Sequence, residues 1–156
     1  MKELLQLEII ENNECRHRDL KFSIKGLIER QEFDTYFFAV QIDDFENLRE
    51  IKNAVVNLLN YWAMETQNAK DDRPIYLPID FSDEYTGCIR VLGQGDQVVL
   101  TYGFSHLEGH SVNPLNPGNY CNSISDFEMT VNQSIEVSKI DFLNSIAHQI
   151  RLLQNS

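Results

Sequence analysis

One long amphipathic helix is the feature of this sequence that most restricts the fold. Between positions 44 and 67, apolar side chains recur every three or four residues, which is the spacing of one face of an α-helix. Asp43 and Glu46 have the spacing of an acidic capping box and predict a helix start near Asp44. The apolar face consists of Phe45, Leu48, Ile51, Val55, Leu58, Leu59 and Trp62. Such a face needs a sheet or another helix to cover it, so we assign Trp62 to the core.

Three strands are predicted before this helix. Residues 4–10 and 20–28 alternate apolar and polar side chains, which is typical of half-buried strands. Gly26, inside the second segment, indicates a bulge or bend. Residues 35–42 are aromatic and almost continuously apolar, which favours a central strand.

Four strands and a second helix are predicted after it. Residues 75–78 are bracketed by Pro74 and Pro78 and fit a short or edge strand. The segments 85–93 and 97–104 flank Gly-Gln-Gly-Asp, a sequence that suits a hairpin turn. A further strand is expected at 127–137, with a break near Asn132 and Gln133. Ser138 and Asp141 can cap a final helix at 139–154.

These elements predict a single α+β domain over residues 1–156, in the order β-β-β-α-β-β-β-β-α. We expect a mainly antiparallel sheet with two principal helices, about 44–67 and 139–154, whose apolar faces lie against the sheet. Two separate sheets joined through the long helix are a variant of this arrangement. The length fits one domain, and no linker or repeat interrupts it.

Charge is unevenly distributed along the chain. The sequence has 24 acidic and 13 basic residues, but residues 74–138 contain eight acidic residues and one basic residue, Arg90. A surface built from this stretch would repel nucleic acid, whose binding requires Lys and Arg, and would attract a basic protein. The alternative is an acidic surface that serves only solubility.

The sequence favours a cytoplasmic protein that does not enter a membrane. The first residues lack the apolar run of a secretory signal, and no segment reaches the roughly 18 apolar residues of a membrane span. The three cysteines, Cys15, Cys88 and Cys121, form no Cys-x-x-Cys pair, which is typical of free thiols in a reducing compartment. The oligomeric state is left open by the sequence.

A possible metal site lies at the start of a long polar loop, residues 105–126. In an extended chain His106, Glu108 and His110 would point to one face and could bind a metal ion together. A further ligand would have to come from Cys121, Asp80 or Asp83. The alternative, which we favour, is that one histidine packs beneath the loop and the other is solvated.

A second candidate site lies at residues 77–87, where acidic and aromatic residues are concentrated. Carboxylates in such a turn could do acid–base chemistry, but they could also pair with Lys or Arg of a partner while aromatic rings supply contact area. We expect an interface built from Asp80, Phe81, Asp83, Glu84, Tyr85, Glu108 and Tyr120. A simple structural turn is the alternative.

Our leading hypothesis is a non-enzymatic, acidic binding or inhibitor protein that masks a basic protein partner and needs no cofactor. In size and acidic charge the chain is similar to bacterial immunity proteins and other small inhibitors, a resemblance of composition alone, and a toxin-neutralising immunity protein would be one example. The alternative is a small metal-assisted hydrolase that uses His106, Glu108 and His110 with Asp80 or Asp83.

Overall fold

The computed structural model describes residues 3–11, 18–36 and 47–156, and it confirms the predicted α+β class and element order. Short helices η1 and α3 are added within the long loop. The elements are β1 (Leu5–Glu11), β2 (Arg18–Ile24), β3 (Ile28–Asp34), α2 (Leu48–Gln67), β4 (Ile75–Phe81), β5 (Thr86–Gln94), β6 (Gln97–Ser105), η1 (Gly109–Ser111), α3 (Tyr120–Ser123), β7 (Glu128–Ser138) and α4 (Lys139–Asn155).

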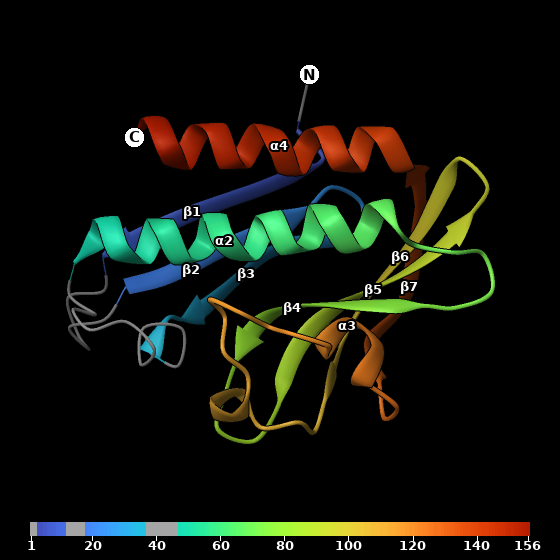
Figure 1. Ribbon diagram of the computed structural model, residues 1–156, viewed down its shortest axis with the longest axis horizontal. Coiled ribbons are helices and arrows are strands. Elements are labelled where there is room, and N and C mark those ends of the chain that lie inside the picture. Colours follow the sequence, from blue (N-terminus) through green and yellow to red (C-terminus); the bar gives the residue numbers. More distant parts are fainter. Residues whose placement is uncertain (1–2, 12–17, 37–46) are drawn as a thin grey trace.

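The strands form two antiparallel sheets, which is the variant with separate sheets (Figure 1). The first sheet has the order β1-β2-β3 and the second β4-β5-β6-β7, so that β4 is an edge strand as its prolines predict. The β5–β6 hairpin turns at Gly95, whose φ is 62°. β7 loses its register with β6 between Thr101 and Gly103, opposite the predicted break near Asn132 and Gln133.

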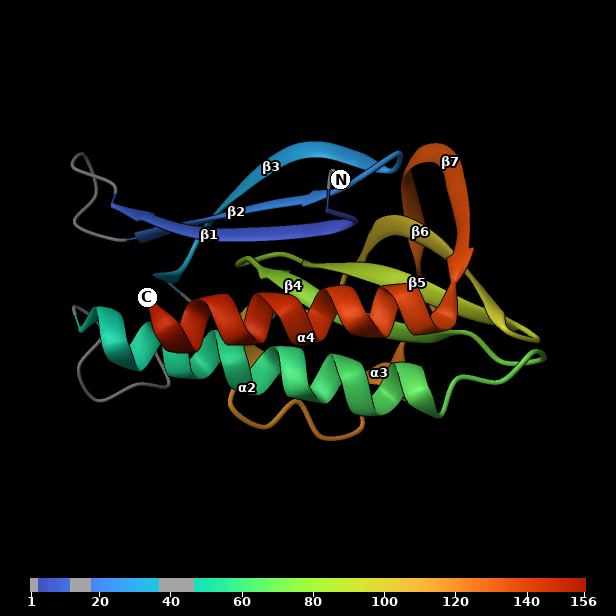
Figure 2. The ribbon, with the colours of Figure 1, turned by 90° about the horizontal axis from the view of Figure 1, so that it is seen from above.

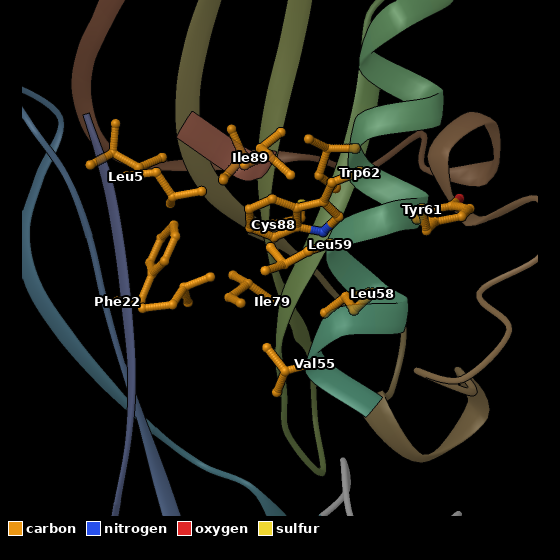
Figure 3. Close-up of a cluster of buried hydrophobic side chains, with 14 of the residues drawn as sticks. Leu5, Phe22, Val55, Leu58, Leu59, Tyr61, Trp62, Ile79, Cys88 and Ile89 are labelled. Carbon is orange, nitrogen blue, oxygen red and sulfur yellow. The ribbon is translucent and has the colours of Figure 1, made fainter. Parts of the chain in front are cut away.

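Helix α2 packs against side chains of both sheets through Trp62. Trp62 is fully buried, its Nε1 donates to the carbonyl oxygen of Pro78 at 2.9 Å, and its ring meets Phe22 edge to face at 6.1 Å. Figure 3 shows the Trp62 ring in one cluster with Phe22 of the first sheet and Ile89 of the second, whereas Tyr61 points to the other side of the helix. The predicted assignment of Trp62 to the core is confirmed.

Helix α4 runs beside α2 and along β1, the edge strand of the first sheet (Figure 2). Buried Gln149 acts as an extra strand residue for that edge: its Oε1 accepts from the N–H of Leu7 at 3.1 Å, and its Nε2 donates to the carbonyl of Leu5 at 2.9 Å. The Ser138 side chain caps the helix at Asp141, as predicted. The apolar face of α4 therefore lies on α2 and on a sheet edge, not flat on a sheet.

Several predicted boundaries differ from the structure, and β4 extends three residues beyond the predicted 75–78. The strand expected at 20–28 is a hairpin: β2 ends at Ile24, Gly26 (φ 84°) forms the turn, and β3 begins at Ile28. Helix α2 begins at Leu48, because Asn47 has an extended backbone and its side chain accepts from the N–H groups of Arg49 and Glu50. The expected strand at 35–42 lies outside the described residues from position 37, and the expected cap at Asp43 and Glu46 lies outside them entirely.

The long loop is ordered by its contacts with α2. The Tyr61 hydroxyl accepts from the N–H of Cys121 at 2.9 Å, and the Asn57 amide donates to the carbonyl of Leu115. Three residues of the loop itself, Val112, Pro114 and Ile124, are buried. Among the described residues, no helix combines the length and the apolar composition that a membrane span requires.

Candidate functional site: an acidic surface with aromatic side chains

The β4–β5 turn carries the most exposed of the predicted interface residues. The N–H of Ser82 donates to the carbonyl of Tyr85 at 3.0 Å and closes the turn. Asp83 and Glu84 are therefore exposed at the tip, and the side chain of Tyr85 is 37% exposed. The turn that the sequence predicts is present, and it presents two carboxylates and one ring to solvent.

The long loop returns to this turn at η1. The N–H of Gly109 donates to the carbonyl of Ser82 at 2.7 Å, and the two segments lie together at the lower edge of Figure 1. A Cβ at position 109 would lie 2.5 Å from the backbone of Ser82, so this approach requires glycine. The contact places exposed Glu108 beside the turn that holds Asp83.

An acidic hollow of about 650 Å³ lies between the end of β3 and the β4–β5 turn. None of the described residues that line it is Lys, Arg or His. Its lining residues are Glu32, Phe33, Asp34, Tyr36, Asp80, Phe81, Ser82, Asp83 and Tyr85. Arg30 pairs with Glu32 at 2.7 Å, so the uncompensated negative charge of the hollow comes from its three aspartates.

Asp80 differs electrostatically from the other carboxylates of the hollow. Its pKa is raised from 3.8 to about 6, mainly by burial; the hydrogen bond from Tyr85 lowers this pKa and the charge of Asp34 raises it. The pKa of Tyr85 is raised as well, by burial and by the charge of Asp80. Asp80 is thus a carboxylate that has lost much of its water, and the described residues lining the hollow offer it no cation.

Two of the predicted interface residues belong to the core instead. Phe81 is 4% exposed and Tyr120 is 3% exposed. The Tyr120 hydroxyl shares a hydrogen bond of 2.5 Å with Thr86 Oγ1, and burial raises its pKa. These rings anchor the turn and the loop from beneath, and the accessible surface consists of the other five predicted residues.

The structure does not assemble the metal site of the hydrolase hypothesis. His106 follows the end of β6 and lies 3.5 Å from Glu128, whereas His110 lies in η1 and pairs with Glu108 at 3.0 Å. The chain turns at this point, so the three side chains share no strand face. In the described part of the chain, no three His, Cys, Asp or Glu residues are grouped to hold a metal ion. The structure contradicts the hydrolase alternative, because His106, Glu108 and His110 do not form the metal site that it requires.

Cys121, which the sequence offered as a further metal ligand, lies beside helix α2. Its thiol donates to Glu65 Oε2 at 3.0 Å, and burial, together with this bond, raises its pKa to about 11. Cys88 is buried, and burial raises its pKa to about 12. Both thiols are therefore protonated at neutral pH and are poor nucleophiles.

Comparison with known proteins identifies the fold but no family. No protein-family model matches the sequence, and no curated protein matches it. The chain is similar to a chain in the solved structure of a CdiA-CT/CdiI toxin and immunity complex from Enterobacter cloacae. The TM-score is 0.52 and the sequence identity 12%, with 97% of this chain and 100% of that chain covered. This likeness shows a shared fold over nearly the whole chain.

Sequence reasoning missed the contribution of β3 to the surface. Glu32, Asp34 and Tyr36 lie far from the 77–87 segment in sequence, and only the approach of the two sheets brings them to Asp80. The acidic residues Glu32 and Asp34 are only a weak sequence signal that β3 contributes to this surface. Tyr102 and Phe104 lie in a strand, as the sequence predicts, but their half-buried position beside Tyr85 depends on how the strands pack.

Proposed function

We propose that this protein is an immunity protein, a non-enzymatic inhibitor that binds a basic protein partner and masks its working surface. The observation that carries the proposal is the acidic hollow with its neighbouring turn and η1, where carboxylates and tyrosines are gathered without a basic residue in the described lining. Carboxylates beside aromatic rings are suited to a surface rich in Lys and Arg.

The fold comparison supports an inhibitor role. The solved structure is described as a toxin and immunity complex, and the likeness extends over almost all of both chains. Of the two roles in such a pair, we assign the immunity role to this chain. Toxins that act on nucleic acid present basic surfaces, and a net charge of −11 suits the protein that covers such a surface.

The mechanism that we propose is electrostatic attraction followed by steric occlusion. Asp83 and Glu84 extend from the turn and would meet cations of the partner, and Tyr85 would supply apolar contact area. Glu108 already pairs with His110, so we expect it to contribute less. The site of action is the cytoplasm, where a protein that protects its own cell would meet the toxin.

Capture of the partner followed by a growth assay tests this role. The tagged protein is used to isolate partners from its native cell, and each captured protein is then expressed in a different host with and without this chain. We expect one captured protein to arrest growth alone and to be neutralised by co-expression. The proposal fails if this chain arrests growth by itself, or if no captured protein is toxic in a way that co-expression relieves.

A further inference from the structure

A second, smaller hollow lies beside the acidic one and shares Asp80 and Tyr85 with it. Its volume is about 270 Å³, and Tyr102 and Phe104 of β6 complete its walls. Pockets for drug-sized ligands typically measure roughly 300–1,000 Å³. The dimensions of this hollow suit one inserted side chain better than a larger molecule.

Strand register explains how the hollow forms. Asp80 pairs with Gly87 of β5, and Gly87 pairs with Phe104 of β6, so these three residues form a row on one face of the sheet. A Cβ at position 87 would lie 2.8 Å from the Cβ of Asp80 and 3.0 Å from the Tyr102 hydroxyl. Glycine therefore leaves the floor bare between a carboxylate and an aromatic wall.

The walls of the hollow are aromatic and its charge is negative. Tyr85 and Phe104 pack edge to face at 6.0 Å, and the Tyr85 hydroxyl bonds to Asp80. No basic residue occurs among the described residues that line the hollow. Aromatic faces attract cations, and this attraction grows when the cation is desolvated. A guanidinium group can stack on a ring while it donates two hydrogen bonds to a carboxylate.

We propose that this hollow receives one arginine side chain of the protein partner, with the guanidinium bound to Asp80 and stacked against the ring of Tyr102 or Phe104. The inference rests on the proposed function for the identity of the partner. It goes further in naming one anchoring pocket and the side chain that fills it. Lysine is a weaker ligand here, because its ammonium group is more strongly hydrated and cannot stack.

Titration with a blocked arginine tests the pocket without any partner. N-acetylarginine methylamide is added to the protein, and the ring signals of Tyr85, Tyr102 and Phe104 are followed by NMR. The matched probe is the blocked citrulline, which has a similar shape and no charge. We expect saturable shifts with arginine that citrulline does not produce. We also expect Asp80→Asn to weaken arginine binding at least about tenfold.

Two further variants make this test specific. Asp96→Asn, at the far end of β5, removes one exposed carboxylate and should leave arginine binding unchanged. Phe104→Leu keeps an apolar side chain but removes one ring wall and should weaken arginine binding. Equal shifts with arginine and citrulline would contradict the proposed arginine pocket. Arginine binding by Asp80→Asn as tight as by the parent would also contradict it.

The captured partner separates this inference from the proposed function. Support requires that Asp80→Asn lowers affinity for the partner at least about tenfold while Asp96→Asn does not. If the parent protein relieves toxicity and Asp80→Asn binds the partner as tightly as the parent, the pocket is overturned and the immunity role stands. If the parent relieves no toxicity, the proposed function is overturned, and the arginine titration still reports on the hollow itself.

Discussion

At the scale of single residues, Asp80 lowers the stability of the folded protein, although we propose that the same carboxylate binds the partner. Burial raises its pKa to about 6, so the folded protein holds this proton more tightly than the unfolded chain does. The carboxylate therefore lowers the free energy of unfolding as the pH rises from about 4 to 6, and this loss persists above pH 6. Its cost at neutral pH is on the order of 3 kcal/mol, because each pKa unit corresponds to about 1.4 kcal/mol.

Replacing Asp80 with Asn should therefore stabilise the protein. We expect the free energy of unfolding of Asp80→Asn to exceed that of the parent by about 3 kcal/mol at pH 7.5 and to match it near pH 4. The groups that face Asp80, namely Asp34, Tyr85 and Tyr102, are retained in both proteins. Urea unfolding at the two pH values measures the difference. Asp96→Asn is the control and should change little, whereas a loss of stability in Asp80→Asn at pH 7.5 would contradict this account.

Trp62 makes the opposite contribution, since it is fully buried and joins both sheets to α2. Trp62→Ala should lower the free energy of unfolding by about 3–5 kcal/mol, because a large cavity and an unpaired Pro78 carbonyl remain. Urea unfolding of the variant measures this loss. A change near zero would mean that α2 does not pack as described.

At the scale of the elements, local patterns predicted what local physics determines. The helical face of α2, the cap of α4 and the Gly95 hairpin each depend on residues close in sequence, and the structure confirms them. The sequence pattern did not predict strand β3. Only Ile28 and Phe33 of its seven residues are buried, so the strand lacks the usual alternation of apolar and polar side chains. The tertiary approach of β3 to β4 creates the acidic hollow, and no short segment encodes that approach.

The edge of β1 depends on one side chain of α4. Gln149→Leu would keep a similar shape but leave the N–H of Leu7 and the carbonyl of Leu5 without partners. We expect a loss of about 2–4 kcal/mol in the free energy of unfolding, because each buried unpaired group costs about 1–3 kcal/mol. Chemical denaturation measures it. Gln154→Leu, an exposed position on the same helix, is the matched control, and equal stability of the two variants would contradict the role of Gln149.

At the scale of the whole molecule, two sheets joined by one helix create a surface that neither sheet has alone. β3 of the first sheet supplies Glu32 and Asp34, β4 of the second supplies Asp80, and the turn after β4 supplies Asp83. Because the separate sheets meet at this hollow, their relative position sets its charge density. A binding surface at such a junction can recognise the spacing of cations on a partner as well as their number.

The affinity for the captured partner at two salt concentrations tests the central claim most directly. Exposed charges are screened within about 10 Å at 0.1 M salt and about 3 Å at 1 M salt. We predict that raising the salt from about 0.05 M to about 0.5 M weakens binding at least about tenfold. Asp83→Lys should weaken it by about 30-fold at low salt, as expected for an interface hot spot. Asp96→Lys, with the same change of net charge, should have little effect. Binding that is insensitive to salt and to Asp83→Lys would contradict an acidic surface that masks a basic partner.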